Sequence, residues 1–349
     1  YIEIGVNHEI NDDYVGINPF DENSEVIKLW NKVIDEDRKV KTVLEKRISD
    51  IKDIPKNKRE AVATVIAKGI MKGYSNGLYV LNREFRGNNK ITVSGAKDVI
   101  KKVLNPKERA QVSPDGLLIR TTNLPKNANE YRYILESFPN EYYEMKYKFM
   151  FLTDYISGTM KKDEYAYPKE VDYDYLYNSY YHKQLTIETG KYGKYDELLS
   201  NVEKYFNLIF NVDYRTIDEK WKNELASTFI FFSWNNTVYE LIDRYINNVK
   251  KNHVKVEVDK IAIDPAAMYE YRECLILRAY VKYRVTADDM NVSSKQLIFN
   301  SYIENIKKGE WKETIFDIFL DCSFHDYSYK WGPSWFDAIN DYAFNESFK

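Results

Sequence analysis

The stretch LILRAYVKYRV, residues 275–285, decides the fold of the C-terminal half of the chain. Every second residue in it is apolar or aromatic, which is the period of a β-strand with one buried face. Residues 316–324 repeat this alternation after Lys308-Gly309-Glu310, a segment suited to a tight turn. We therefore expect two neighbouring antiparallel strands. Their buried residues are Leu275, Leu277, Ala279, Val281, Tyr283 and Val285 in the first strand and Phe316, Ile318, Leu320, Cys322 and Phe324 in the second.

Residues 254–263 predict a third strand. Valine recurs there at alternate positions, and the phase of the pattern then slips, which indicates a β-bulge near Asp259. We expect the Asp264-Pro265 pair to turn the chain after this strand.

Helical patterns precede the strands. Residues 202–210 place Val, Tyr, Phe and Ile on one helical face. Two capping boxes predict the starts of further helices, Thr216 with Glu219 and Thr237 with Glu240. Helices followed by an antiparallel meander make an α+β roll over residues 196–349. The element order resembles cystatin-like folds, a likeness of architecture that implies no function.

The polar residues of the two central strands lie opposite their apolar face. Cross-strand pairing of opposite charges is one explanation, and a basic groove for an acidic glycan is the other. The basic residues are Arg272, Arg278, Lys282 and Arg284, and the acidic ones are Glu313, Asp317 and Asp321.

Residues 105–195 read as an ordered connector punctuated by prolines, because their aromatic content is too high for disorder. Leu117 to Ile119 is a short strand-like piece. A clearer strand is expected from Tyr143 to Phe151, where aromatic residues and Met145 alternate with mostly polar ones.

Aromatic residues are the candidates for glycan binding, because tyrosine and tryptophan rings combine an apolar face with a polar group. The alternative is that the tyrosines pin a loop to the body and that the tryptophans clamp a terminal helix. The candidates are Tyr173, Tyr175, Tyr177, Tyr180, Tyr181, Trp331 and Trp335.

Residues 1–104 read as a helical module. Residues 24–51 carry one apolar stripe, and residues 53–104 predict a helix, an irregular turn and a second helix. Gly69 marks the end of the first of these helices, and Thr92 is the expected N-cap of the second.

The order of residues between 53 and 92 resembles an S-layer homology repeat. The matching pieces are Asp53-Ile54-Pro55, Gly69-Ile70-Met71-Lys72-Gly73-Tyr74, Asn76-Gly77, Leu81-Asn82 and Ile91-Thr92. In that family such repeats bind secondary cell-wall polysaccharide without covalent attachment. The resemblance covers about residues 51–104 and implies two helices joined by a glycine-shaped turn.

This chain departs from the family at its glycan-binding arginine, whose position aligns with Val93. A guanidinium binds carboxylates through paired charge-assisted hydrogen bonds, which valine cannot supply. The module is therefore either a weak binder of anionic glycan or a structural remnant. The retained turn residues are Gly73, Tyr74, Asn76, Gly77, Arg83 and Arg86.

Composition narrows the choice of partner. A net charge of −3 argues against nucleic acid, and no apolar run is long enough to span a membrane. Cys274 and Cys322 are the only cysteines, so at most one disulfide can form. The four histidines lack metal-ligand spacing, and we expect no metal, cofactor or catalytic residue. Abundant Lys and Glu with few Gln suit a heat-adapted protein, although an AT-rich genome leaves the same signature.

These features predict an extracellular, non-enzymatic protein that contacts the cell wall or another polysaccharide. The chain starts at Tyr1, which fits removal of a signal peptide but equally a start chosen for other reasons. The alternatives are a polysaccharide-active enzyme of the glycoside hydrolase type and a protein-interaction module. We expect three domains, residues 1–104, 105–195 and 196–349.

Overall fold

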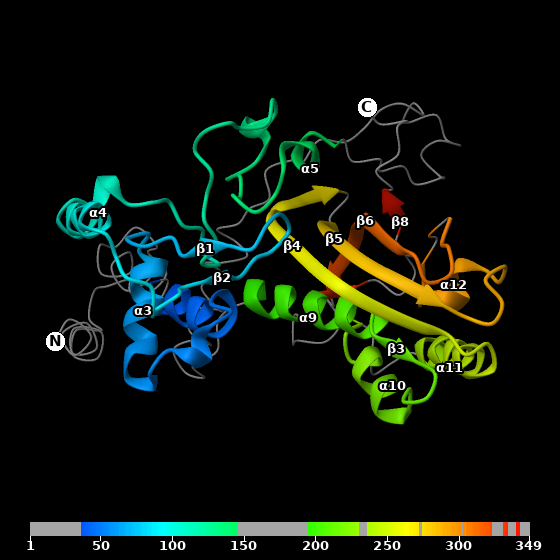
Figure 1. Cartoon of the computed structure of the whole chain (residues 1–349). Coiled ribbons are helices and arrows are strands. Elements are labelled where there is room, and N and C mark those ends of the chain that lie inside the picture. Colours follow the sequence, from blue (N-terminus) through cyan, green and yellow to red (C-terminus); the bar gives the residue numbers. More distant parts are fainter. Residues whose placement is uncertain are drawn as a thin grey trace, which may run out of the picture. The chain divides into compact units, whose positions relative to one another are not determined.

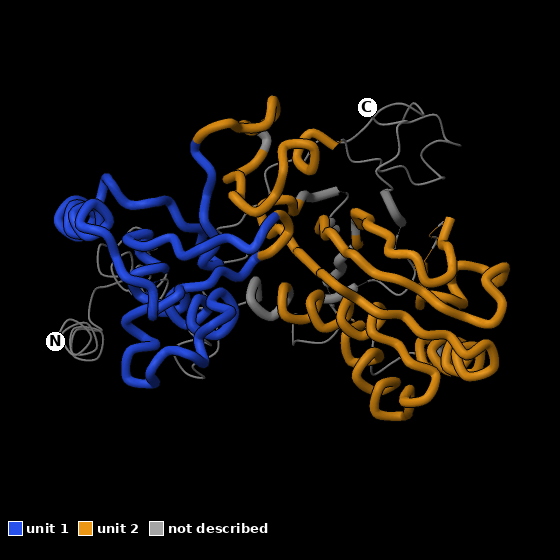
Figure 2. Tube along the Cα trace, in the orientation of Figure 1, with its two compact units in different colours: residues 1–77, 81–121, 178–192 blue, residues 78–80, 122–177, 193–349 orange. Residues whose placement is uncertain are grey.

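The computed structural model describes residues 36–145, 194–229, 236–271, 274–301, 303, 305–322, 331–333 and 340–342. The chain divides into two compact units, coloured separately in Figure 2. Unit 1 comprises residues 1–77, 81–121 and 178–192, and unit 2 comprises residues 78–80, 122–177 and 193–349. The mixture of helices and antiparallel strands makes the fold α+β, as the sequence predicted.

Unit 1 is built from short helices around a small hairpin. Residues 36–42 are helical and continue into a π-helical turn, η1 (Val43–Arg47). The short 3₁₀ turns η2 (Ile51–Asp53) and η3 (Lys56–Lys58) lead into α3 (Arg59–Ala67). The hairpin strands β1 (Tyr74–Ser75) and β2 (Arg83–Glu84) follow, and then come α4 (Val93–Leu104) and η4 (Pro106–Glu108). The predicted helix–turn–helix order is therefore present.

A small apolar core holds the N-terminal helices of unit 1 together. It is formed where α3 packs on η1, and Phe85 packs against it from the hairpin side. The core residues are Val43, Ile48, Ile54, Val62, Ala63, Ile66 and Ala67.

Two sequence signals in unit 1 act as expected. Gly69 ends α3 with a φ of 67°, a left-handed conformation that glycine adopts without strain. Its carbonyl accepts a hydrogen bond from the Ala110 amide at 3.0 Å. The Thr92 side chain accepts a hydrogen bond from the Gly95 amide at 3.1 Å, so Thr92 is the N-cap of α4.

Unit 2 contains a six-stranded antiparallel sheet in the order β3-β4-β5-β6-β7, with β8 also paired to β6 (Figure 1). Its long strands are β4 (Lys255–Tyr271), β5 (Cys274–Thr286) and β6 (Trp311–Cys322). The short strands are β3 (Val212–Asp213), β7 (Trp331–Pro333) and β8 (Asn340–Tyr342). The predicted pairing of residues 275–285 with the strand after Gly309 is confirmed.

Helices cover one face of this sheet. Figure 1 shows α9 (Lys194–Ile209), α10 (Glu219–Ala226) and α11 (Asn236–Lys251) gathered on that face. The short helix α12 (Ser294–Leu297) lies in the connection between β5 and β6 and packs on α11. The main core forms between the sheet and these helices, and every predicted apolar position of the 202–210 helix is buried in it.

Aromatic residues cover part of the opposite face. The Tyr79 ring stacks on the Tyr280 ring with centroids 3.7 Å apart and planes 3° apart. Phe138 meets the Tyr79 ring edge-on, with the ring centroids 5.5 Å apart. Tyr142, on the short helix α5 (Asn140–Glu144), also meets the Tyr79 ring edge-on, at 6.1 Å. The Tyr79 backbone has a φ of 56°, and its amide donates to the Ser137 carbonyl at 2.8 Å. This left-handed backbone conformation is unfavourable for tyrosine, and the burial and stacking of the ring stabilise it.

The predicted bulge near Asp259 is confirmed, but the prediction of a turn at Asp264-Pro265 is wrong. The register shifts between Val258 and Lys260, whereas β4 continues to Tyr271. A second irregularity between Ile263 and Met268 accommodates the proline, which has no N–H for the ladder. The buried Asp264 carboxylate accepts a hydrogen bond from the Ala266 amide at 2.8 Å, so the turn-forming chemistry shapes a bulge instead.

Two other local expectations are corrected. α10 begins at Glu219, and its N-cap is Asp218 rather than the predicted Thr216. The Asp218 carboxylate accepts a hydrogen bond from the Trp221 amide at 2.9 Å. α11 begins at Asn236, so Thr237 already lies inside it.

The strand expected from Tyr143 to Phe151 also differs. Its first residues belong to α5 and the turn after it, and residues 146–151 lie outside the described part. The neighbouring residues Tyr142 and Tyr143 are both fully buried, whereas a strand with one buried face would bury only one of them.

Gly69→Ala should destabilise unit 1 by about 2–4 kcal/mol, because alanine disfavours this φ and overpacks its surroundings. A Cβ on Gly69 would lie 2.0 Å from the Ala110 carbonyl oxygen. Chemical denaturation with hydrogen exchange of the α3 amides measures the effect. Gly87→Ala is the matched control, since a Cβ there meets only Phe85 at an ordinary 3.5 Å. Equal stability of the two variants would contradict the assigned backbone.

Tyr79→Phe should leave the stability of unit 2 unchanged or slightly higher. The Tyr79 hydroxyl is buried and makes no hydrogen bond among the described residues, so its removal leaves no partner unsatisfied. Tyr142→Phe should instead cost about 1 kcal/mol, because the Tyr142 hydroxyl donates to the Arg278 carbonyl at 3.0 Å. Thermal unfolding of both variants provides the comparison, and a larger loss for Tyr79→Phe would show that its hydroxyl is bonded.

Candidate functional site

The candidate turn lies between β1 and β2 of unit 1 and is shaped by Gly73. This glycine has a φ of 64°, and a Cβ on it would lie 2.9 Å from the Glu84 carbonyl oxygen. Tyr74 pairs with Glu84, and Ser75 pairs with Arg83. Glycine therefore lets the two strands approach at the point where the predicted turn begins.

Asp50 fixes the far side of the hairpin. Its two carboxylate oxygens accept hydrogen bonds from the amides of Phe85 and Arg86, each at 2.7 Å. The Ser49 amide also donates to the Arg83 carbonyl at 3.0 Å. The segment after η1 thus holds the chain where it leaves β2.

The two arginines of the turn have different roles. Arg83 donates to the Lys72 carbonyl at 2.7 Å and to the Gly73 carbonyl at 3.2 Å, so it braces the turn itself. Arg86 donates to the Glu84 carboxylate at 2.7 Å, and its guanidinium carbon lies 4.4 Å above the Tyr74 ring centroid. The Tyr74 side chain is exposed, and so is Arg86. An aromatic ring, a cation and a carboxylate are therefore presented together at the surface.

The remaining turn residues contribute shape. Gly77 has a φ of 115°, its amide donates to the Ser75 hydroxyl at 3.2 Å, and both it and Asn76 are exposed. Val93, the position at which the resemblance implies an arginine, is the first residue of α4 and is 75% exposed. The guanidiniums near this turn thus come from β2 and the residues after it.

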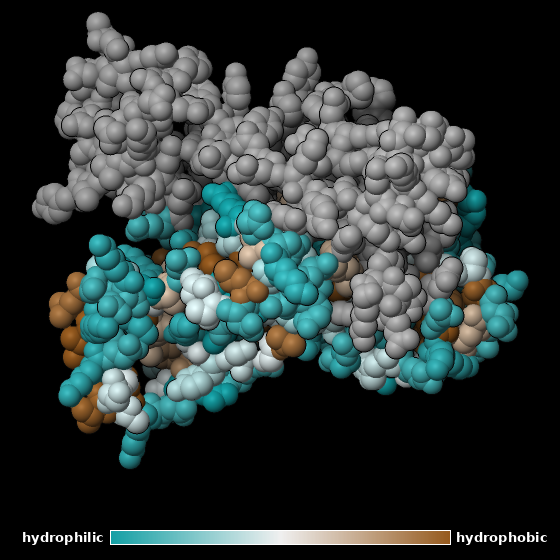
Figure 3. All heavy atoms as spheres, turned by 90° about the horizontal axis from the view of Figure 1, so that it is seen from above, coloured by the Kyte–Doolittle hydropathy of each residue, from teal (hydrophilic) through white to brown (hydrophobic). Residues whose placement is uncertain are grey.

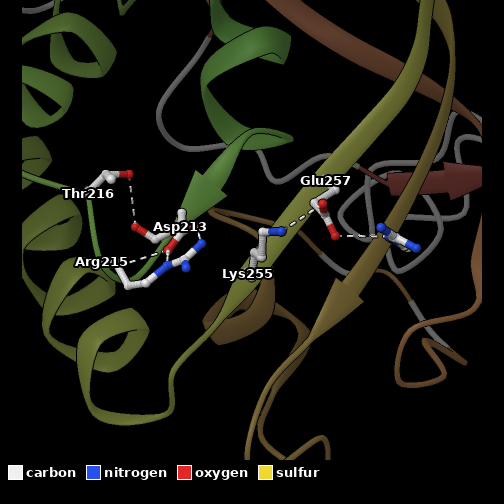
Figure 4. A network of polar contacts seen from close by, with 6 residues as sticks. Asp213, Arg215, Thr216, Lys255 and Glu257 are labelled. Atoms are coloured by element: carbon white, nitrogen blue, oxygen red, sulfur yellow. Dashed lines mark hydrogen bonds and ion pairs between the residues drawn. The ribbon is translucent and has the colours of Figure 1, made fainter.

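A second group of polar residues lies on strands β3, β4 and β5 of the unit 2 sheet and directly after β3 (Figure 4). Glu257 on β4 accepts from Lys255 at 2.7 Å and from Arg284 on β5 at 2.9 Å. These two hydrogen bonds lower the pKa of Glu257. Nearby, Asp213 pairs with Arg215, and the hydrogen bond from that guanidinium lowers the pKa of Asp213 to about 2.

The charges on the central strands pair across the sheet where side chains are described. Lys282 lies 3.7 Å from Glu313 on β6 and 3.4 Å from Asp259 on β4. Arg278 is different, because it is fully buried and donates to the Met145 carbonyl at 2.8 Å and the Tyr142 carbonyl at 3.3 Å. These contacts favour charge pairing and packing over a continuous basic groove. Arg272 and the side chains of Asp317 and Asp321 lie outside the described residues.

Trp311 is an exposed aromatic residue that the sequence patterns did not single out. It is the first residue of β6, directly opposite Arg284 in the register, and it is 45% exposed. It has the same odd-numbered phase as Glu313 on the polar face of β6. That phase, in a strand whose even positions from Phe316 to Cys322 are apolar, was the signal that could have identified it.

The side chains of the other aromatic candidates lie outside the described part of the chain. Tyr173, Tyr175, Tyr177, Tyr180, Tyr181 and Trp335 lie outside the described residues. The backbone of Trp331 pairs with Cys322 in the β6–β7 ladder, and its side chain lies outside the description. Their role in glycan binding stays a prediction, as does a disulfide between Cys274 and Cys322.

Helix α4 carries an apolar face that the described structure leaves exposed. Hydrophobic atoms gather over this helix at the left of Figure 3. The exposed apolar residues here are Val93, Ile100, Val103 and Leu104 on the helix and Ile91 just before it. Elsewhere, the described residues include no helix long and apolar enough to cross a bilayer, and no cluster of three or more potential metal ligands.

Asp50→Ala should loosen the hairpin by removing both acceptors of the Phe85 and Arg86 amides. Leaving those amides without partners costs about 1–3 kcal/mol, so we expect them to exchange hydrogen at least about fivefold faster. Hydrogen exchange with mass spectrometry on a peptide covering both residues measures this. Asp53→Ala, which removes an exposed carboxylate from the same segment, should leave that peptide unchanged. Equal protection in both variants would contradict the anchoring role of Asp50.

Comparison with known proteins identifies a segment of this chain. The S-layer homology domain matches residues 47–92, which include Asp50, the whole β1–β2 turn and Thr92. No curated protein and no solved structure matches the chain. Residues 47–92 therefore form a single S-layer homology repeat, and this repeat indicates association with the cell surface or cell wall.

Proposed function

We propose that this protein is an extracellular, non-catalytic surface protein that contacts wall polysaccharide through its S-layer homology repeat. The observation that carries the proposal is the match over residues 47–92 together with the built turn inside it. The aromatic-rich segments containing Tyr173 to Tyr181, Trp331 and Trp335 belong to the proposal as additional glycan contacts.

The chemistry of the turn supports a sugar ligand. Tyr74 offers an exposed ring, and Arg86 above it offers guanidinium donors to hydroxyl or carboxylate oxygens. Glu84 orients Arg86 through their 2.7 Å hydrogen bond. In this proposal Arg86 supplies the cation that the family has at the position of Val93.

The simultaneous change of Tyr74 and Arg86 to alanine should reduce binding to purified bacterial sacculi. Losing a stacked ring and a charge-assisted hydrogen bond should weaken the binding free energy by about 1.4 kcal/mol or more, so the apparent Kd should rise at least about tenfold. Co-sedimentation at increasing sacculus concentration measures the change. The matched control is the simultaneous change of Leu124 and Lys126 to alanine, an exposed apolar residue and an exposed cation in unit 2.

Sacculi stripped of their secondary polymers show whether the polysaccharide itself is bound. We expect the wild-type protein to bind intact sacculi and to lose this binding on stripped ones. Absence of sedimentation with intact sacculi would refute wall binding. Equal affinity of the double variant and the wild type would refute the role of the turn.

A second candidate function, protein interaction, is favoured by the apolar face of α4. Exposed apolar patches on soluble domains often mark association surfaces. In this alternative, Leu104, which is 78% exposed, lies in a contact with another protein chain. Sedimentation velocity over a concentration series tests the simplest form, self-association. A concentration-dependent increase in size that Leu104→Glu abolishes would support it, and a monomer at every concentration would contradict it.

A further inference from the structure

The polar face of the unit 2 sheet is divided into a covered part and an open part. Around Arg278 and Tyr280 the face is buried beneath Tyr79, Phe138 and Tyr142. Farther along the same strands, residues at the same alternating phase are exposed or half-buried. We call this open part the Trp311 face. It consists of Glu257, Asp259, Lys282, Arg284, Trp311 and Glu313.

The indole of Trp311 is positioned by its neighbours. The Arg284 guanidinium carbon lies 4.8 Å from the ring centroid, and the Lys282 ammonium lies 5.9 Å from it. Both cations are themselves held by carboxylates, Arg284 by Glu257 at 2.9 Å and Lys282 by Asp259 at 3.4 Å. Cation–π attraction therefore fixes the ring against the sheet while 45% of the residue stays exposed.

The polar groups of this face are nearly balanced in charge. The three carboxylates of Glu257, Asp259 and Glu313 face the cations of Lys282 and Arg284, and Lys255 adds a third cation through its contact with Glu257 at 2.7 Å. Lys260, opposite Lys282 in the register, is a fourth cation, and its ammonium donates to the Leu78 carbonyl at 3.3 Å. A polyanion would meet repulsion from three carboxylates, and a polycation would meet four basic groups. The surface instead offers alternating hydrogen-bond donors and acceptors beside one apolar plane.

We propose that the Trp311 face binds neutral sugar units of a polysaccharide. The electron-rich indole face attracts the C–H groups on one side of a pyranose ring, while the flanking carboxylates and cations hydrogen-bond its hydroxyls. Strand β5 is hydrogen-bonded to β4 on one side and to β6 on the other, so these groups keep their spacing without a pocket. The inference deepens the proposed function and rests on it for the choice of a polysaccharide, but it concerns different residues from those of the turn.

Fluorotryptophan NMR tests this site in the full chain. The protein has six tryptophans, and the signal missing from Trp311→Ala identifies Trp311. Titration with cellohexaose, maltohexaose and chitohexaose should shift that signal for at least one of them. Trp311→Ala should weaken binding of that sugar at least tenfold, and Trp311→Phe should retain most of the affinity. Glu313→Gln should weaken it less than Trp311→Ala, and Leu124→Ala is the control for loss of an exposed apolar side chain.

Each outcome decides the proposal. A Trp311 signal that no neutral oligosaccharide shifts overturns it, as does binding restricted to polygalacturonate or heparin. Unchanged affinity in Trp311→Ala overturns it as well, and unchanged thermal unfolding of that variant excludes a folding defect as the cause of lost binding. A Trp311 response without binding to sacculi refutes wall attachment alone. Binding to sacculi with a silent Trp311 refutes the Trp311 face alone.

Discussion

The packing of Phe210 against Tyr283 and Phe316 is the contact on which the fold of unit 2 depends. The centroid of the Phe210 ring lies 4.9 Å from that of the Tyr283 ring and 5.4 Å from that of the Phe316 ring. Phe210 directly follows α9, Tyr283 lies on β5 and Phe316 lies on β6, and all three are fully buried. Because burying one face of β5 and β6 fixes the phase of both strands, the opposite phase must carry Arg284, Lys282 and Trp311 on the other face. The position of the polar surface thus follows from the position of the core.

Unit 1 depends on backbone geometry more than on a large core. Gly69 and Gly73 have positive φ and closely approach backbone oxygens, while Asp50 and Arg83 bind main-chain groups of the turn. A repeat of this kind can lose a surface side chain without losing its shape, because few of the shape-determining contacts involve that side chain. The exposed Val93 side chain can therefore differ from the arginine that the family resemblance implies at this position without a change in the shape of the repeat.

The sequence predicted regular periodic features well and failed where side-chain hydrogen bonds compete. Alternation gave β5, β6 and the bulge near Asp259, because one buried face imposes a period of two. It missed that Asp264 bonds its own local backbone and so keeps Pro265 within β4, and that Asp218 rather than Thr216 caps α10. The order of the turn residues along the chain was readable from the sequence, but their role as a site stays a prediction, and the separate contacts of Arg83 and Arg86 depend on distances that spacing does not give. Trp311 was missed because its significance comes from Arg284 on the neighbouring strand.

The S-layer homology repeat at residues 47–92 indicates that this protein is associated with the cell surface. Immunogold labelling of intact cells that produce the protein, with an antibody against unit 2, tests this claim most directly. Gold particles along the wall of intact cells, largely lost after extraction of wall polysaccharide, are the predicted result. Labelling that appears only in sectioned cytoplasm would contradict it.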